Sequence, residues 1–110
     1  MNIDEFASLD WLEPWGAVHG LMARGLEEEL EKEVAPGHPL YERRAIAVGR
    51  SFALDDVLYF LPEGNHPLAV VRLLWRGQVN GEDSSWPRTI LYSSLEEWDE
   101  KCMKPDHQSF

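Results

Sequence analysis

The sequence has a single cysteine, Cys102, and only ten lysine and arginine residues against twenty aspartates and glutamates. One cysteine excludes a disulfide within the chain, which is typical of proteins in a reducing compartment. No apolar run approaches the roughly 20 residues that a membrane-spanning helix needs. The start MNIDEFASLD has neither a basic region nor an apolar run. We therefore expect no signal peptide and a cytoplasmic location.

Motifs that carry chemistry are also missing. The sequence contains no HExxH, P-loop, nucleophile elbow or dinucleotide fingerprint. Its four histidines are scattered and have no second ligand at zinc spacing: His19, His38, His66 and His107. We predict no catalytic residue, no metal site and no cofactor. Cys102 shares the apolar side of an expected helix with Trp98, which favours a packed thiol over a reactive one.

Basic charge is scarce, and the acidic excess is uneven. The net charge is -10. Met1 to Glu33 hold nine acidic and two basic residues, a balance of -7. Such a field repels nucleic acid and anionic membranes, which bind through lysine and arginine. It attracts a basic protein partner and speeds its association. The alternative is that the acidity only keeps the protein in solution.

The length of 110 residues fits one domain. Residues 1–34 form its acidic helical part. A short helix is expected over Asp4–Leu12, and a longer one over Pro14–Val34, since proline suits the first turn of a helix. The longer helix has an apolar stripe at spacings of three and four, widened by Leu21: Trp15, Val18, Met22, Leu26 and Leu30.

Residues 43–92 have the pattern of an antiparallel sheet. Four strands are expected: Arg43–Phe52, Asp55–Pro62, Leu68–Trp75 and Thr89–Tyr92. The second and third are apolar at nearly every position, so we expect them to be covered on both faces. Small residues of the first strand (Ala45, Ala47 and Gly49) predict a helix packed closely against one of its faces.

Residues 94–104 predict a C-terminal helix. Ser94 and Glu97 have the spacing of a capping box, and Pro105 is expected to end the helix. The sum is an α+β domain in two layers, a four-stranded antiparallel meander packed by an N-terminal and a C-terminal helix.

The stretch WRGQVNGEDSSWP begins at Trp75, and its second tryptophan is Trp86. Both tryptophans flank a connection between two paired strands. We expect them to pack against the sheet or a helix at the base of a long hairpin. The loop between them, Gly77–Ser85, would then project into solvent and be free to bind.

Two sets of residues are candidate sites. The first is an acidic surface for a basic partner, although a run of glutamates is also typical of a plain solvated helix face: Glu27, Glu28, Glu31, Glu82 and Asp83. The second is a pocket for an anionic ligand beside aromatics, joined by His66 or His107: Arg72, Trp75, Trp86 and Arg88. Alternatively, Arg72 pairs within the fold with Asp55, Asp56 or an acid of a helix.

The runs ALDDVLYFL, LAVVRLLWRG and WPRTILYSSLEEWDEKCMKPDH carry a resemblance. Between Phe52 and His107 the chain resembles a group of small bacterial proteins that have no established activity. The resemblance implies a bacterial cytosolic protein and supplies no catalytic residues. The composition is also similar to that of immunity proteins of bacterial toxin systems.

Three hypotheses follow. The first is a protein-binding module, immunity- or antitoxin-like, that masks a basic partner. The second is a small enzyme or ligand-binding domain with its site between sheet and helix. The third is a homo-oligomer built through an exposed apolar face. The lack of catalytic motifs favours binding over catalysis.

Overall fold

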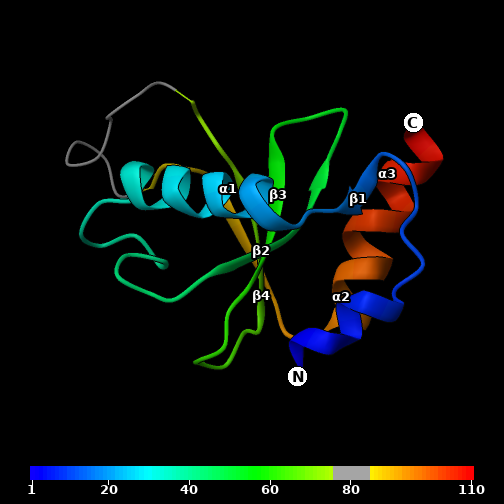
Figure 1. Ribbon diagram of the computed structural model, residues 1–110, viewed down its shortest axis with the longest axis horizontal. Helices are drawn as coiled ribbons and strands as arrows, with labels where there is room; N and C mark the ends of the chain where they lie inside the picture. The colour runs from blue at the N-terminus through cyan, green and yellow to red at the C-terminus, as the bar shows by residue number, and fades with distance from the viewer. Residues whose placement is uncertain (76–84) are drawn as a thin grey trace.

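The computed structural model describes residues 1–75 and 85–110. Five strands form one antiparallel sheet in the order β1-β2-β3-β4-β5 (Figure 1). Their bounds are Trp15–Ala17, Ile46–Ser51, Asp56–Phe60, Leu68–Arg72 and Thr89–Tyr92. The helices are η1 (Ile3–Ser8), α1 (Gly20–Glu33), α2 (Leu95–Trp98), η2 (Asp99–Met103) and α3 (Lys104–Ser109). The α+β class and the antiparallel sheet are confirmed.

The prediction of four strands was wrong because Trp15–Ala17 is a strand and not the start of a helix. Trp15 pairs with Ser51 and Ala17 with Gly49, so β1 adds a fifth strand beside β2. In this strand the Trp15 ring is buried in the core. The helix begins only at Gly20, after an extended His19. The first expected helix is also shorter, a 3-10 turn η1 capped by Asn2 and Glu5.

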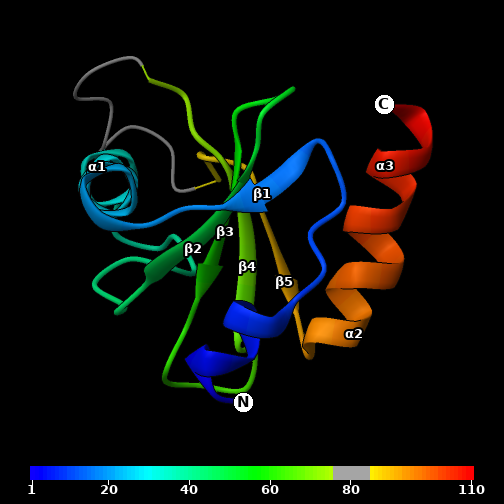
Figure 2. The same cartoon turned by 45° about the vertical axis from the view of Figure 1, so that its right-hand side comes forward.

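The fold has three layers instead of the expected two, because both faces of the sheet are covered (Figure 2). On one face α1 packs a cluster that includes Leu26, Leu30, Tyr59 and Val71. On the other face the N-terminal segment and the C-terminal helices pack a cluster that includes Phe6, Trp15, Leu58, Trp98 and Met103. All of β3 and β4 except Arg72 is buried, as their apolar sequences predicted.

The C-terminal helix does not end at Pro105. Ser94 caps its start, since its hydroxyl accepts the Glu97 N–H at 3.0 Å. The chain then widens into the π-helical turn η2, where the Lys104 N–H reaches back five residues to the Asp99 carbonyl. Pro105 lies in the first turn of the α-helical segment that follows, where its missing N–H is tolerated. The helix therefore continues to Ser109.

The small residues of β2 pack against two different faces. The register of β2 with β3 shifts between Ala47 and Gly49, a β-bulge that changes the alternation of the strand. Ala47 consequently packs in the α1 cluster, as expected. Gly49 instead lies under the ring of Trp11, on the opposite side of the sheet. The expectation that Gly49 also faces a helix was wrong for this reason.

Gly49→Ala is expected to destabilise the fold by about 1–3 kcal/mol, the usual cost of overpacking. A Cβ at Gly49 would clash with the Trp11 ring and lie 3.1 Å from the Gly16 carbonyl oxygen. The matched control is Gly25→Ala on α1, where a Cβ meets open space. This control should gain roughly 1 kcal/mol from helix propensity. Urea unfolding measures both, and equal effects of the two changes would contradict the packing of Trp11 on Gly49.

Candidate partner-binding groove

The glutamates of α1 divide between two sides of the helix. Glu28 and Glu31 are exposed, whereas Glu29 and Glu33 are buried. Glu27 is half-buried, and its Oε2 accepts the Ala47 N–H of β2 at 3.0 Å. Of the acidic surface expected on this helix, Glu28 and Glu31 therefore form the solvent-facing part. Burial of Glu33 was not predictable from the sequence, because its hydrogen-bond partners, Leu74 and Trp75, lie far along the chain.

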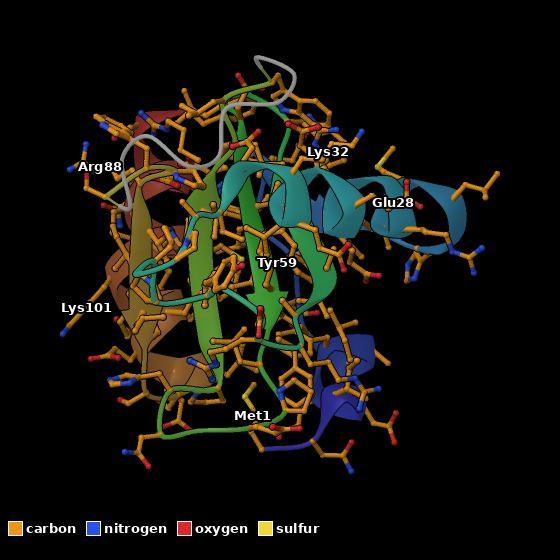
Figure 3. All side chains as sticks on the ribbon, turned by 90° about the vertical axis from the view of Figure 1, so that its left-hand side faces the viewer. Met1, Glu28, Lys32, Tyr59, Arg88 and Lys101 are labelled. Carbon is orange, nitrogen blue, oxygen red and sulfur yellow. The ribbon has the colours of Figure 1, made fainter. Side chains whose placement is uncertain are left out.

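The exposed acids of α1, Glu28 and Glu31, form no ion pair with a described residue. Glu28 and Lys32 stand four residues apart on α1 (Figure 3), but no ion pair forms between them. The ion pairs of the described residues lie elsewhere: one joins β4 to β3, and the others lie within the C-terminal helix. The outer side of α1 consequently presents carboxylates that remain available to a partner's cations.

Glu33 anchors the chain that leaves β4. Its two carboxylate oxygens accept the N–H of Leu74 at 2.8 Å and the N–H of Trp75 at 2.9 Å. Burial raises the pKa of Glu33 to about 7, and the neighbouring Glu29 carboxyl adds to the rise. The two backbone hydrogen bonds act in the opposite direction. The side chain is only 2% exposed, so we attribute the raised pKa chiefly to lost solvation.

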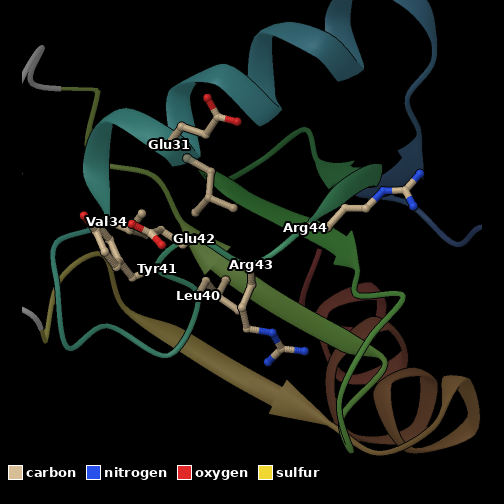
Figure 4. A pocket seen from close by; sticks show the side chains of 8 residues that line it. Glu31, Val34, Leu40, Tyr41, Glu42, Arg43 and Arg44 are labelled. Atoms are coloured by element: carbon tan, nitrogen blue, oxygen red, sulfur yellow. The ribbon is translucent and has the colours of Figure 1, made fainter.

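Three adjoining cavities follow the side of α1 that faces residues 40–48. The first, of about 460 Å³, lies between α1 and residues 40–44 (Figure 4). The second, of about 360 Å³, shares Leu30, Glu31, Arg43 and Arg44 with the first. The third, of about 380 Å³, shares Glu27 and Ile46 with the second. We call this succession the α1 groove. Volumes of this size are typical of binding sites.

The α1 groove combines an apolar base with charges of both signs. Leu30, Val34 and Leu40 supply apolar surface between the helix and the loop. Arg43 donates to the Glu63 carbonyl of the β3–β4 turn, which holds its guanidinium away from Glu31 (Figure 4). Arg44 is exposed and makes no ion pair with a described residue. Such a surface suits a polypeptide, which offers apolar and charged groups together.

The second candidate set is placed differently from expectation. Arg72 forms a two-pronged ion pair with Asp56, with Nε–Oδ1 at 2.7 Å and Nη2–Oδ2 at 3.1 Å. This pairing raises the pKa of Arg72 and confirms the internal pairing that the sequence suggested as an alternative. Arg88 is exposed, and its carbonyl accepts the Arg72 N–H at 3.0 Å. The Arg72 guanidinium is therefore committed to the fold.

Trp75 and Trp86 are not packed at the base of the hairpin as expected. They are 51% and 48% exposed, whereas Leu73 is buried in the core. Trp75 adopts a left-handed φ of 55°. Neither tryptophan lines the three cavities of the α1 groove. Two members of the expected acidic surface lie outside the described residues, Glu82 and Asp83. The same holds for residues 77–84 of the loop between the two tryptophans.

His38 and Cys102 have structural surroundings. The buried His38 Nδ1 accepts the Leu40 N–H at 3.0 Å, so Nε2 carries the proton and donates to the Pro87 carbonyl at 2.9 Å. It ties the segment after α1 to the start of β5, a role that the sequence did not reveal. Burial raises the pKa of the Cys102 thiol to about 12, which agrees with a packed rather than a reactive cysteine.

Comparisons with known proteins give no information about this site. No family model, no curated protein and no solved structure matches the chain. Across residues 1–75 and 85–110, no group of three or more histidine, cysteine, aspartate or glutamate side chains is arranged to hold a metal ion. In the same part of the chain, no helix is long and apolar enough to cross a membrane.

Proposed function

We propose that the protein is a cytoplasmic protein-binding module that masks a basic protein partner, as an immunity or antitoxin protein does. The observation that carries the proposal is the outer side of α1, where Glu28 and Glu31 are exposed without an ion-pair partner among the described residues. Uncompensated carboxylates on one element steer a cationic partner and fix its orientation. The net charge of -10 strengthens this field.

The α1 groove supports the same proposal. It lies directly beside the acidic helix and is lined by charges of both signs above the buried side chains of Leu30, Val34 and Leu40. Protein interfaces combine polar and apolar groups in this way. A small-ligand site around Arg72, Trp75, Trp86 and Arg88 has less support, because Arg72 already pairs with Asp56. The two exposed tryptophans instead resemble aromatic anchors of a protein interface.

The test is affinity capture from the native host with two charge-reversed variants. Glu28→Lys with Glu31→Lys changes the outer side of α1. Asp10→Lys with Glu96→Lys makes the same change of net charge at exposed positions elsewhere. We expect the wild type and the second variant to retain one basic protein at physiological salt, and the first variant to lose it by at least about tenfold. Equal retention by both variants, or no basic protein at all, would contradict the proposal.

A further inference from the structure

We propose that the partner inserts an extended segment of alternating apolar and basic residues beside the N-terminal half of β2, as an added strand of the sheet. This inference rests on the proposed function and specifies how the partner binds. Addition of a strand to an open sheet edge is a common mode of peptide recognition, because backbone hydrogen bonds supply affinity and side-chain pockets supply specificity.

The edge of β2 is only partly covered by β1. Pairing of the two strands ends at Ala17 and Gly49, and the Val18 N–H makes a last bond to the Val48 carbonyl at 3.2 Å. The chain then leaves the sheet at Gly20, where a left-handed φ of 57° turns it into α1. A longer β1 would continue beside Ile46–Val48. The cavity of about 380 Å³ occupies this position, between η1 and α1.

One backbone donor of this open edge is held by a side chain instead of a strand. The Ala47 N–H donates to the Glu27 carboxylate at 3.0 Å. Exposed strand edges tend to pair with other chains, and a charged side chain over the edge is a common way to block such pairing. Glu27 can turn aside because it is only half-buried on the surface of a helix. A carbonyl of the incoming strand would then accept the Ala47 N–H in its place.

The two walls of the cavity determine the partner's sequence pattern. Successive side chains of a strand point to opposite faces of the sheet. On one face the added strand would meet the apolar Ile3 and Phe6 of η1. On the other face it would meet Ala23 and the Glu27 carboxylate freed from Ala47. Apolar residues therefore suit the first face and lysine or arginine the second, in agreement with the acidic charge of the chain.

The primary test uses a short peptide of alternating valine and lysine, followed by NMR of the 15N-labelled protein. We expect the Ala47 amide resonance to shift and its hydrogen exchange to slow at least about tenfold on binding. The same peptide with all its backbone amides N-methylated cannot donate hydrogen bonds to the edge of β2. It should bind at least about tenfold more weakly. Equal binding of the two peptides, or no effect at Ala47, overturns strand addition.

A second test locates the basic residue of the peptide. The wild type should prefer the valine–lysine peptide over a valine–serine peptide by about fivefold. Glu27→Ala should remove this preference, whereas Glu96→Ala, an equal charge change at an exposed position of α2, should retain most of it. A preference that survives Glu27→Ala overturns the assignment of Glu27 as the contact of the basic residue.

Failure of strand addition and failure of the proposed function give different experimental results. If the captured basic partner depends on Glu28 and Glu31 but neither peptide perturbs Ala47, strand addition is wrong and the acidic docking surface stands. If the peptides bind at Ala47 but no basic protein is captured, the edge takes extended segments and the proposed masking function is wrong.

Discussion

Trp98→Ala is expected to lower the free energy of unfolding by about 3–5 kcal/mol, the usual cost of truncating a buried aromatic side chain. Trp98 is 0% exposed and lies at the centre of the cluster between the sheet and the C-terminal helices. Its ring makes edge-to-face contacts with Trp15 at 5.3 Å and Trp11 at 5.9 Å between centroids. Truncation would remove both contacts and leave a cavity that these rigid neighbours cannot fill.

The measurement is urea unfolding followed by circular dichroism, with Trp86→Ala as the matched control. Trp86 is the same residue type but 48% exposed, so its truncation should cost less than about 1 kcal/mol. A loss of 3–5 kcal/mol should also lower the Tm by about 10–25 °C. Equal effects of the two truncations would contradict the division of tryptophans between core and surface.

The second large effect is a fall in stability as the pH rises from about 4.5 to about 7. The pKa of Glu33 is raised from 4.5 in the unfolded chain to about 7 in the fold, so the native state holds a proton that the unfolded state has released. The stabilisation is complete below pH 4.5 and is lost as the pH passes through about 7. A shift of this size corresponds to at most about 3 kcal/mol.

Glu29→Gln isolates this contribution. An amide at Glu29 removes the like charge beside Glu33 and can donate a hydrogen bond to its carboxylate, so the pKa of Glu33 should fall. We expect the variant to be more stable than the wild type at pH 8 and nearly equal to it at pH 4.5. Glu28→Gln is the control, since Glu28 is exposed on the opposite side of α1. Parallel stability curves of the wild type and Glu29→Gln between pH 4.5 and 8 would contradict the coupling.

Features set by local pattern were predictable from the sequence. The apolar runs of β3 and β4 predicted buried central strands, and Thr89–Tyr92 matches β5 to the residue. Internal pairing of Arg72 was one of two sequence-based alternatives, with Asp55, Asp56 and an acid of a helix as candidate partners. The register of the β3–β4 hairpin places Asp56 opposite Arg72 and so selects it. In each case the residues that decide the structure lie within one strand or one hairpin.

Features set by distant contacts were not predictable. Trp15 and Val18 fit the apolar stripe of a helix as well as they fit a strand. Only the pairing of Trp15 with Ser51 and of Ala17 with Gly49 makes this segment the strand β1. The glutamate run of α1 has the pattern of a solvated face. Glu33 is buried nonetheless, because two backbone N–H groups more than 40 residues away need acceptors. The third cavity of the α1 groove lies where β1 stops short of the end of β2, which no local pattern encodes.

Hydrogen exchange of the complex with the captured basic partner tests the central claim most directly. We expect the partner to slow amide exchange in α1 and at Ile46–Val48, beside the groove and the open edge of β2. Protection confined to α2, η2 and α3, on the opposite face of the sheet, would contradict it.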